Sequence, residues 1–289
     1  MDLSTFPQAF RRLLTETMAY GSVEVNERTG VEIRALEGGH SFKLNLADGR
    51  LPVIGCRKLF PYVAAAEVAW FMTGSKSPAF LREHDVKIWD KFVEPDGLVD
   101  AAYGYRWRFA FDRDQVALAA MALATNPTDR RVWVQAWDPR VDGLGASGQR
   151  NVPCPIGFTF SIVTSPDGMK RLQSSLFIRS SDVFVGLPYD VMGHAMLMEV
   201  VAETVRQLRG EPIGTGTMHV TLAHPHIYSK HYDMAREALE QDLVTRGPLM
   251  YRASIDDVRY WPSSFVKRYR EAAKTVPWPE FNPRPEIVV

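Results

Sequence analysis

The chain has 289 residues, 46% of them hydrophobic and 24% charged, and its 34 basic side chains balance 34 acidic ones. This composition excludes a disordered protein, and without a basic excess a nucleic-acid polymer is not an expected partner. The two cysteines are too few for a disulfide framework and fit a reducing compartment.

The N-terminal third of the sequence predicts two helices separated by strands. Residues 5–20 have apolar side chains at helical spacing, without the basic start and apolar stretch of a signal peptide, so we expect a cytoplasmic protein. Residues 31–45 alternate loosely and end at the turn of residues 47–49, as strands do. Residues 62–73 are apolar on nearly all sides and end at Gly74, which predicts a buried helix too short to span a membrane.

The rest of the sequence predicts three buried strands and one long helix. The strands cover residues 131–137, 157–163 and 172–178, which are rich in β-branched and aromatic side chains. The helix covers residues 188–208 and lies between a proline and a glycine. The segment from Val276 contains four prolines and cannot be helical.

These elements mix helices and strands without strict alternation, which favours the α+β class with a large mixed sheet covered by helices. The sequence has no internal repeat and no linker-like stretch. We therefore expect a single domain over residues 1–289, with residues 276–289 as a C-terminal tail.

Cys154 is the first candidate for chemistry because it stands between two prolines, which cannot donate to a sheet ladder. The thiol is therefore expected on an irregular segment that enters a strand. A lone cysteine is more often a structural thiol than a nucleophile, and a nucleophile needs a nearby cation.

The stretch from Arg179 to Asp190 follows a strand and leads into the long helix. It contains an arginine, two hydroxyl side chains and two carboxylates, and the start of a helix favours an anion. The alternative is a polar loop in which Asp190 caps the helix.

Two further clusters are weaker signals. His224, His226, Tyr228 and His231 crowd one short stretch, but no matching cysteine or carboxylate pattern accompanies them, so we expect no metal. The adjacent arginines 130 and 131 could bind phosphate bidentately, although such pairs more often flank a strand in solvent.

In order and spacing, these segments resemble thymidylate synthases and the related deoxycytidylate hydroxymethylases, from the Arg28-Thr29-Gly30 segment to the last residues. The segments that carry the resemblance are Glu67–Phe71, Ile88–Asp90, Tyr103–Arg108, Asn126–Arg131, Pro153–Cys154, Arg179–Asp190 and His226–Ser229.

The resemblance implies an enzyme that acts on a nucleoside monophosphate, with Cys154 as the nucleophile that adds to C6 of the pyrimidine. Glu67 would manage proton transfers, with Tyr103. The implied substrate contacts are Arg28, Arg179 and Ser180 on the phosphate, Arg130 and Arg131 on the same phosphate from the other subunit of a homodimer, and His226 and Tyr228 on the sugar.

The cosubstrate implied by the resemblance is 5,10-methylenetetrahydrofolate, with no metal. The residues implied for its site are Ile88, Trp89, Asp182, Gly186 and Tyr189. The tail that ends at Val289 would close over it. The resemblance also implies a thymidylate synthase-like fold whose sheet forms the dimer interface.

Asp190 stands where thymidylate synthases have asparagine. A carboxylate offers only acceptors, which suit the amino group of cytosine, and the deoxycytidylate hydroxymethylases also have aspartate there. Pro155 replaces a common histidine, and Asn151 replaces a leucine that usually abuts folate. The polar Asn151 could hold a water molecule and so favour addition of water to the exocyclic methylene intermediate over hydride transfer from folate. Trp89, by contrast, is retained from the synthase pattern.

The sequence therefore predicts a dCMP 5-hydroxymethyltransferase of the kind found in phage-infected bacteria. The alternatives are a dCMP 5-methyltransferase that releases dihydrofolate, a CMP 5-hydroxymethylase, and a non-catalytic nucleotide- or RNA-binding relative.

Overall fold

The structure is a computed structural model that describes residues 3–26, 29–144, 151–242 and 245–285. Its helices are α1 Phe6–Tyr20, α2 Pro61–Thr73, α3 Ala79–Glu83, α4 Tyr103–Arg108, α5 Gln115–Thr125, α6 Leu187–Arg209, α7 Tyr232–Glu240, α8 Ile255–Tyr260 and α9 Pro262–Ala272. Short 3₁₀ turns cover Asp90–Phe92, Ser229–His231 and Ala273–Thr275.

Two sheets are present. The larger has the order β1-β4-β9-β7-β6-β5, and the smaller has the order β2-β3-β10-β8. Their strands are β1 Leu3–Ser4, β2 Ser22–Asn26, β3 Val31–Ala35, β4 His40–Asn45, β5 Trp133–Gln135, β6 Pro155–Thr164, β7 Lys170–Ile178, β8 Ser181–Asp182, β9 Ile213–Leu222 and β10 Pro225–Tyr228.

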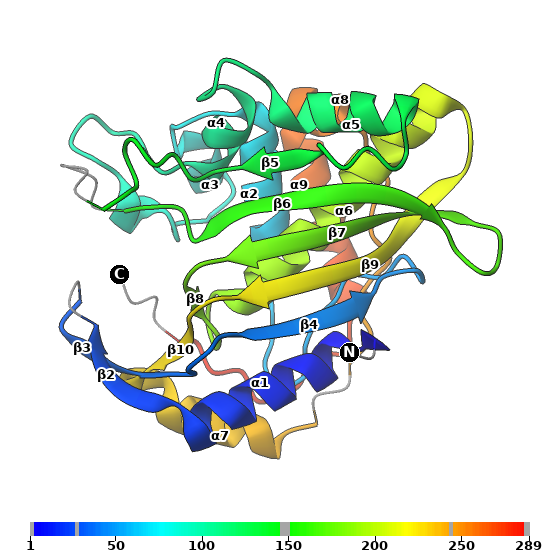
Figure 1. Cartoon of the computed structure of the whole chain (residues 1–289). Coiled ribbons are helices and arrows are strands. Elements are labelled where there is room, and N and C mark those ends of the chain that lie inside the picture. Colours follow the sequence, from blue (N-terminus) through cyan, green and yellow to red (C-terminus); the bar gives the residue numbers. More distant parts are fainter. Residues whose placement is uncertain (1–2, 27–28, 145–150, 243–244, 286–289) are drawn as a thin grey trace.

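The larger sheet is mixed, as expected from the sequence. β7 runs antiparallel to β6 but parallel to β9, and β9 runs antiparallel to β4. The helices α2, α6 and α9 lie behind this sheet in Figure 1, and no described helix crosses the near face of β6, β7 and β9. The α+β class with a helix-covered mixed sheet is confirmed.

The two buried helices form where the sequence predicted them. α2 ends at Gly74, whose φ of 69° is the left-handed conformation expected of a glycine C-cap. α6 has proline in its first turn and ends at Gly210, with φ 66°. Both are buried on most sides because α2 packs against α6 and α9, while α6 also packs on β7 and β9.

Close packing between α2 and α4 depends on one glycine. A Cβ atom on Gly104 would lie 2.2 Å from the Cα atom of Phe71 in α2. Only glycine permits this approach. The contact brings the first turn of α4, with Tyr103, next to the face of α2 that carries Glu67.

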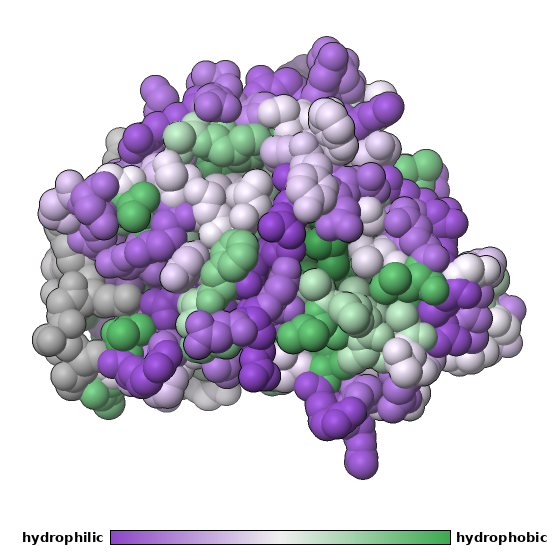
Figure 2. Space-filling model, turned by 90° about the horizontal axis from the view of Figure 1, so that it is seen from above, coloured by the Kyte–Doolittle hydropathy of each residue, from purple (hydrophilic) through white to green (hydrophobic). Residues whose placement is uncertain are grey.

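The surface over α5 is largely polar but not uniformly so. Leu118 and Met121 of α5 are 48% and 58% exposed. Figure 2 shows apolar groups scattered among polar ones on this upper face of the molecule. Isolated apolar side chains of this kind are normal on a protein surface.

Candidate active site

A cavity of about 470 Å³ opens where β6 begins and β7 ends, beside the smaller sheet. It brings together side chains from segments far apart in the sequence. Its lining is Asn26, Glu67, Ile88, Trp89, Phe92, Ala101, Tyr103, Asn151, Val152, Cys154, Arg179, Ser180, Asp182, His226 and Tyr228. Ten of the residues singled out in the sequence as catalytic or binding candidates therefore share one cavity.

Cys154 lies on an irregular segment directly before β6, as its flanking prolines predicted. The register of β6 against β7 shifts between Pro155 and Gly157. A bulge of this kind bends a strand and redirects side chains, and bulges are common beside active sites. The thiol of Cys154 is partly exposed to the cavity.

Arg179 fixes this segment to the end of β7. Its Nε donates to the carbonyl oxygen of Pro153 at 2.9 Å and its Nη2 to that of Val152 at 3.0 Å. Its backbone N–H donates to the carbonyl of Cys154 at 2.9 Å. The guanidinium thus lies in the same cavity as the thiol, where a cation stabilises a thiolate.

The second cysteine provides a contrast. Cys56 is fully buried in the core, and burial raises the pKa of its thiol to about 11. A buried thiol of this kind is inert at neutral pH. Of the two cysteines, only Cys154 is placed to react with a bound molecule.

Glu67 and Tyr103 add two polar groups to the same cavity. The Glu67 carboxylate accepts a hydrogen bond from Trp89 Nε1 at 2.8 Å. Burial raises the pKa of Glu67 to about 8, and the negative charge of Asp190 adds to the effect. The pKa of Tyr103 is also raised well above its usual value, mainly by burial and by the charges of Cys154 and Asp190.

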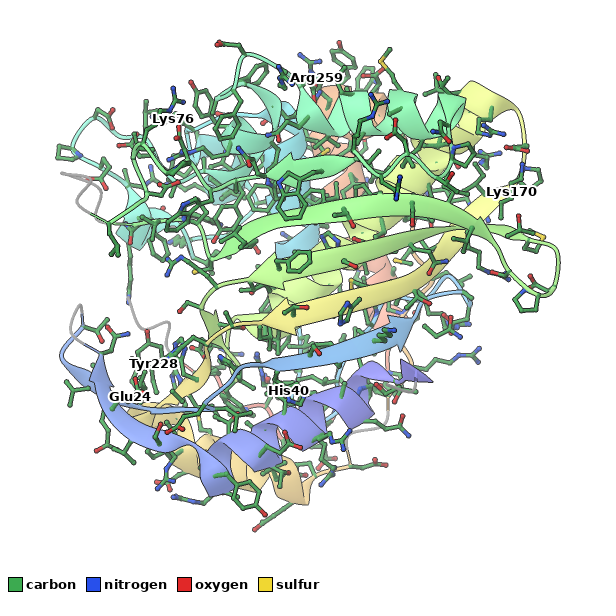
Figure 3. All side chains as sticks on the ribbon, in the orientation of Figure 1. Glu24, His40, Lys76, Lys170, Tyr228 and Arg259 are labelled. Carbon is green, nitrogen blue, oxygen red and sulfur yellow. The ribbon has the colours of Figure 1, made fainter. Side chains whose placement is uncertain are left out.

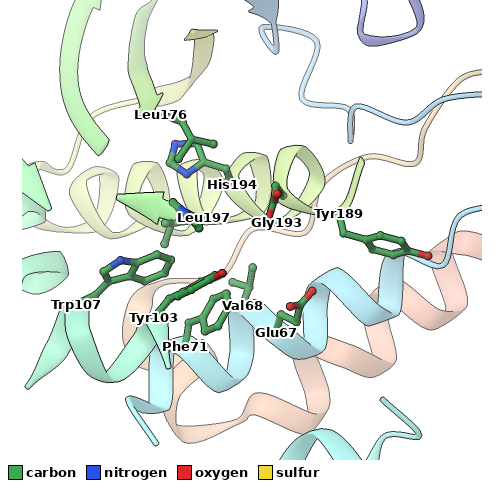
Figure 4. A pocket seen from close by; sticks show the side chains of 12 residues that line it. Glu67, Val68, Phe71, Tyr103, Trp107, Leu176, Tyr189, Gly193, His194 and Leu197 are labelled. Atoms are coloured by element: carbon green, nitrogen blue, oxygen red, sulfur yellow. The ribbon is translucent and has the colours of Figure 1, made fainter. Parts of the chain in front are cut away.

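Asp190 lies in the first turn of α6, where a negative charge is favourable. It lines a smaller inner pocket of about 50 Å³, which shares Glu67 and Tyr103 with the outer cavity. Burial raises the pKa of Asp190 to about 7, with a contribution from Asp182. Figure 4 shows Glu67 of α2 and Tyr103 of α4 extending into this inner pocket.

The residues expected at the folate site are only partly gathered. Ile88, Trp89 and Asp182 line the outer cavity, and Tyr189 lines the inner pocket. Asp182 accepts hydrogen bonds from the backbone of Phe184 at 3.1 Å and Val185 at 3.0 Å, so it also holds the turn before α6. Gly186 caps α6 and lines neither pocket.

The two expected sugar ligands lie side by side on β10. His226 and Tyr228 are buried and have ring centroids 5.2 Å apart. Nδ1 of His226 is 3.1 Å from the carbonyl oxygen of His224. Figure 3 labels Tyr228 at the end of the molecule where β10 lies beside the β2–β3 hairpin.

Four expected phosphate and tail contacts are not seen in the cavity. Arg130 and Arg131 are exposed, and Arg131 forms a bidentate pair with Asp129 at 3.0 and 2.7 Å beside a groove between α5 and β5. Arg28 and Val289 lie outside the described residues.

Several lining residues were not predicted from the sequence. Asn26, Phe92 and Ala101 line the outer cavity, and Trp107 and His194 line the inner pocket. Of these residues, His194 is the one that the sequence could have indicated. It stands four residues after Asp190 on the predicted helix, and its sequence neighbours there are apolar or glycine.

The raised pKa of Glu67 predicts a loss of stability as pH increases. With a pKa of about 8 when folded and near 4.5 when unfolded, the folded state holds the proton more tightly. This contribution is fully present below the unfolded pKa and is lost as the pH rises through the folded one. Glu67→Gln can keep the bond from Trp89 but cannot ionise.

We expect the free energy of unfolding of wild type to fall, relative to Glu67→Gln, by on the order of 3 kcal/mol from about pH 5 to about pH 9, a figure that allows for partial exposure. Denaturant unfolding at both pH values measures the difference. Parallel pH profiles for the two proteins would contradict the raised pKa.

In the part of the chain that the structure describes, no cluster of three or more histidine, cysteine or acidic side chains could hold a metal ion. None of the described helices is long and apolar enough to cross a membrane. The model of one protein family, described as thymidylate synthase, matches residues 8–272.

Proposed function

Because the chain belongs to the thymidylate synthase family, we propose that it is a dCMP 5-hydroxymethyltransferase. The family transfers a one-carbon unit from methylenetetrahydrofolate to C5 of a pyrimidine nucleotide. The observation that carries the proposed substrate is the Asp190 carboxylate, which lines the inner pocket beside Glu67.

Cys154 starts the proposed reaction. C5 of a pyrimidine is a poor nucleophile until a thiolate adds at C6 and converts the ring to an enamine. Arg179 supports this step from beside the thiol. Two of its nitrogens hold the Cys154 segment, and Nη1, which makes no hydrogen bond to the described residues, is available to the nucleotide phosphate together with Ser180 and, from the sequence resemblance, Arg28.

Glu67 and Tyr103 are proposed to move protons. A carboxyl group with a pKa of about 8 is mostly protonated at neutral pH, so Glu67 can both give and take a proton during one turnover. The bond from Trp89 fixes its orientation. His226 and Tyr228 would hold the sugar from β10, at the far side of the same cavity.

The outer cavity has a wall suited to a flat pterin. Ile88, Trp89, Phe92 and Ala101 form an apolar surface there, and Asp182 adds one acceptor. When bound, methylenetetrahydrofolate supplies the one-carbon unit. We assign Tyr189 and Gly186, which lie at the start of α6, to the same site. We assign residues 276–289 to a closing tail, in which Trp278 and Phe281 pack against the core.

Cytosine is the proposed base because of its amino group. In its ionised form, which a pKa of about 7 leaves well populated at neutral pH, the Asp190 carboxylate can accept from N4–H and, once N3 is protonated, from N3–H. Uracil would direct O4 at that same acceptor. A mismatched buried pair of this kind is worth roughly 10⁴-fold in selectivity. Pro155 lines the same inner pocket and has no donor to serve O4.

The choice of a hydroxymethyl product is supported by Asn151, a polar side chain in the outer cavity that can hold water near C5. One observation favours the reductive alternative, a dCMP methyltransferase. Trp89 is retained and lies in the cavity against Tyr103, with ring centroids 5.1 Å apart.

The proposal includes a homodimer with shared active sites. Arg130 and Arg131 are exposed and outside the cavity of their own chain, so they would bind the phosphate in the partner's cavity. The helix-free face of the larger sheet is the proposed interface. It presents half-buried side chains from three adjacent strands, Thr159, Ser175 and Thr217 among them.

The function is tested by incubating the protein with methylenetetrahydrofolate and dCMP, CMP or dUMP in separate reactions. We expect turnover of dCMP, a product heavier by one hydroxymethyl group, and no dihydrofolate absorbance. A methylated product with dihydrofolate would support the methyltransferase instead. Preferential turnover of dUMP would refute the assignment of cytosine, and binding without turnover of any nucleotide would support a non-catalytic relative.

A further inference from the structure

The inner pocket is lined by side chains from α2, α4, α6, the start of β6 and the end of β7. Its volume of about 50 Å³ exceeds the roughly 10–15 Å³ that one water molecule needs on the same measure. One side is polar, with Glu67, Tyr103 and Asp190, and the rest is mainly apolar. The pocket therefore has room for ordered water beside Asp190, which is proposed to recognise the base.

Two nitrogen groups in the wall of this pocket have unused hydrogen-bonding capacity, and of these the indole nitrogen of Trp107 is fully buried. Nε1 of Trp107 is buried and has no partner among the described residues. The imidazole of His194 is 6% exposed and makes one described hydrogen bond, between Nε2 and Ser174 Oγ at 2.7 Å. A buried N–H without a partner, such as that of Trp107, is rare, and ordered water usually satisfies it.

The chemistry of His194 is constrained by its surroundings. Burial lowers the pKa of the imidazole to about 3, so the ring is neutral. It stacks on Phe160 with centroids 6.0 Å apart and meets the edge of Phe158 at 5.0 Å. If Nε2–H donates to Ser174, Nδ1 is a bare acceptor. Figure 4 shows the ring extending from α6 toward Leu176 in the wall of the pocket.

The position of His194 also links it to the base. It follows Asp190 by four residues in α6, so the two side chains share one face of the helix. Both line the inner pocket. We propose that His194 is a specificity-determining residue, which selects the amino group of cytosine through a water molecule bound between its imidazole and the indole of Trp107.

This inference rests on the proposed function and adds to Asp190 a second residue that recognises the amino group of cytosine. The water would accept a hydrogen bond from Trp107 Nε1–H and would donate its two hydrogens to Nδ1 of His194 and to the Asp190 carboxylate. Its remaining lone pair can only accept. It therefore binds the second N4–H of cytosine, which Asp190 does not reach, and faces O4 of uracil as a second acceptor.

The test is the selectivity of His194→Phe, which keeps an aromatic ring against Phe160 but removes both nitrogens. We expect the ratio of kcat/KM for dCMP to that for dUMP to fall roughly tenfold to a hundredfold. The KM for methylenetetrahydrofolate should not change. A structural defect would lower kcat/KM equally for both nucleotides and would leave their ratio constant.

Ser174→Ala provides a second variant if His194→Phe does not fold. Without the hydroxyl, the imidazole proton is free to move to Nδ1, and the water can then turn to donate to O4. The selectivity ratio should fall in the same direction. Met198→Leu is the matched control, since Met198 is buried one turn further along α6 and lines neither pocket.

The outcomes separate the inference from the function on which it rests. A wild-type preference for dUMP would overturn both. A wild-type preference for dCMP that persists unchanged in His194→Phe and Ser174→Ala would overturn only the role of His194. A ratio that falls in both variants and not in Met198→Leu would support it.

Discussion

Cys154→Ser is expected to abolish turnover while the protein still binds dCMP. A serine hydroxyl is almost wholly protonated at neutral pH and is a much weaker nucleophile than a thiolate, so C6 is not attacked. We expect kcat to fall by roughly 10⁴-fold or more. Steady-state assays measure the loss, and calorimetric titration with dCMP measures the retained binding.

The control for this experiment is the other cysteine. Cys56 is buried in the core and lines neither pocket, so Cys56→Ala should keep turnover within a few-fold of wild type. Turnover that survives in Cys154→Ser would contradict the nucleophile assignment. Loss of dCMP binding in the same variant would show instead that the substitution disturbs the segment held by Arg179.

The elements that the sequence predicted are those whose signals lie within the element itself. α2 and α6 are long apolar runs with a proline at one end and a glycine at the other, and both signals act within the helix itself. β9 was not predicted, although it is central in the larger sheet. Residues 213–222 include two glycines and three threonines, and the strand forms because β4 and β7 pair with it on both sides.

Sequence motifs located the outer cavity better than the inner pocket. The outer residues lie at the ends of strands and helices, in short segments that resemble a known family. The inner pocket instead forms where side chains from distant positions meet, such as Trp107, Leu176 and His194. Which of these side chains meet depends on the packing of α2, α4, α6 and β7, and a sequence pattern does not encode that.

A buried cation next to the site was also not predicted. Arg57 is 3% exposed and donates to the carbonyl oxygens of Phe184 at 2.9 Å and Val185 at 3.3 Å. It also lies over the ring of Tyr189 at 5.9 Å. Backbone carbonyls and an aromatic face hold the guanidinium, and the charge of Asp182 acts on it from a distant part of the sequence, so charge patterning in the sequence does not reveal it.

Asp190→Asn is expected to reverse the choice of base. The asparagine amide offers one donor and one acceptor, which match O4 and N3–H of uracil, whereas the carboxylate matches the amino group of cytosine. We expect the ratio of kcat/KM for dCMP to that for dUMP to fall by roughly 10³- to 10⁴-fold. Glu67→Gln is the comparison. Because Glu67 is proposed to transfer protons for either base, its loss should lower kcat/KM for both nucleotides by a similar factor. A dCMP preference that survives in Asp190→Asn would remove the basis of the cytosine assignment, since Asp190 is the proposed direct contact to the amino group.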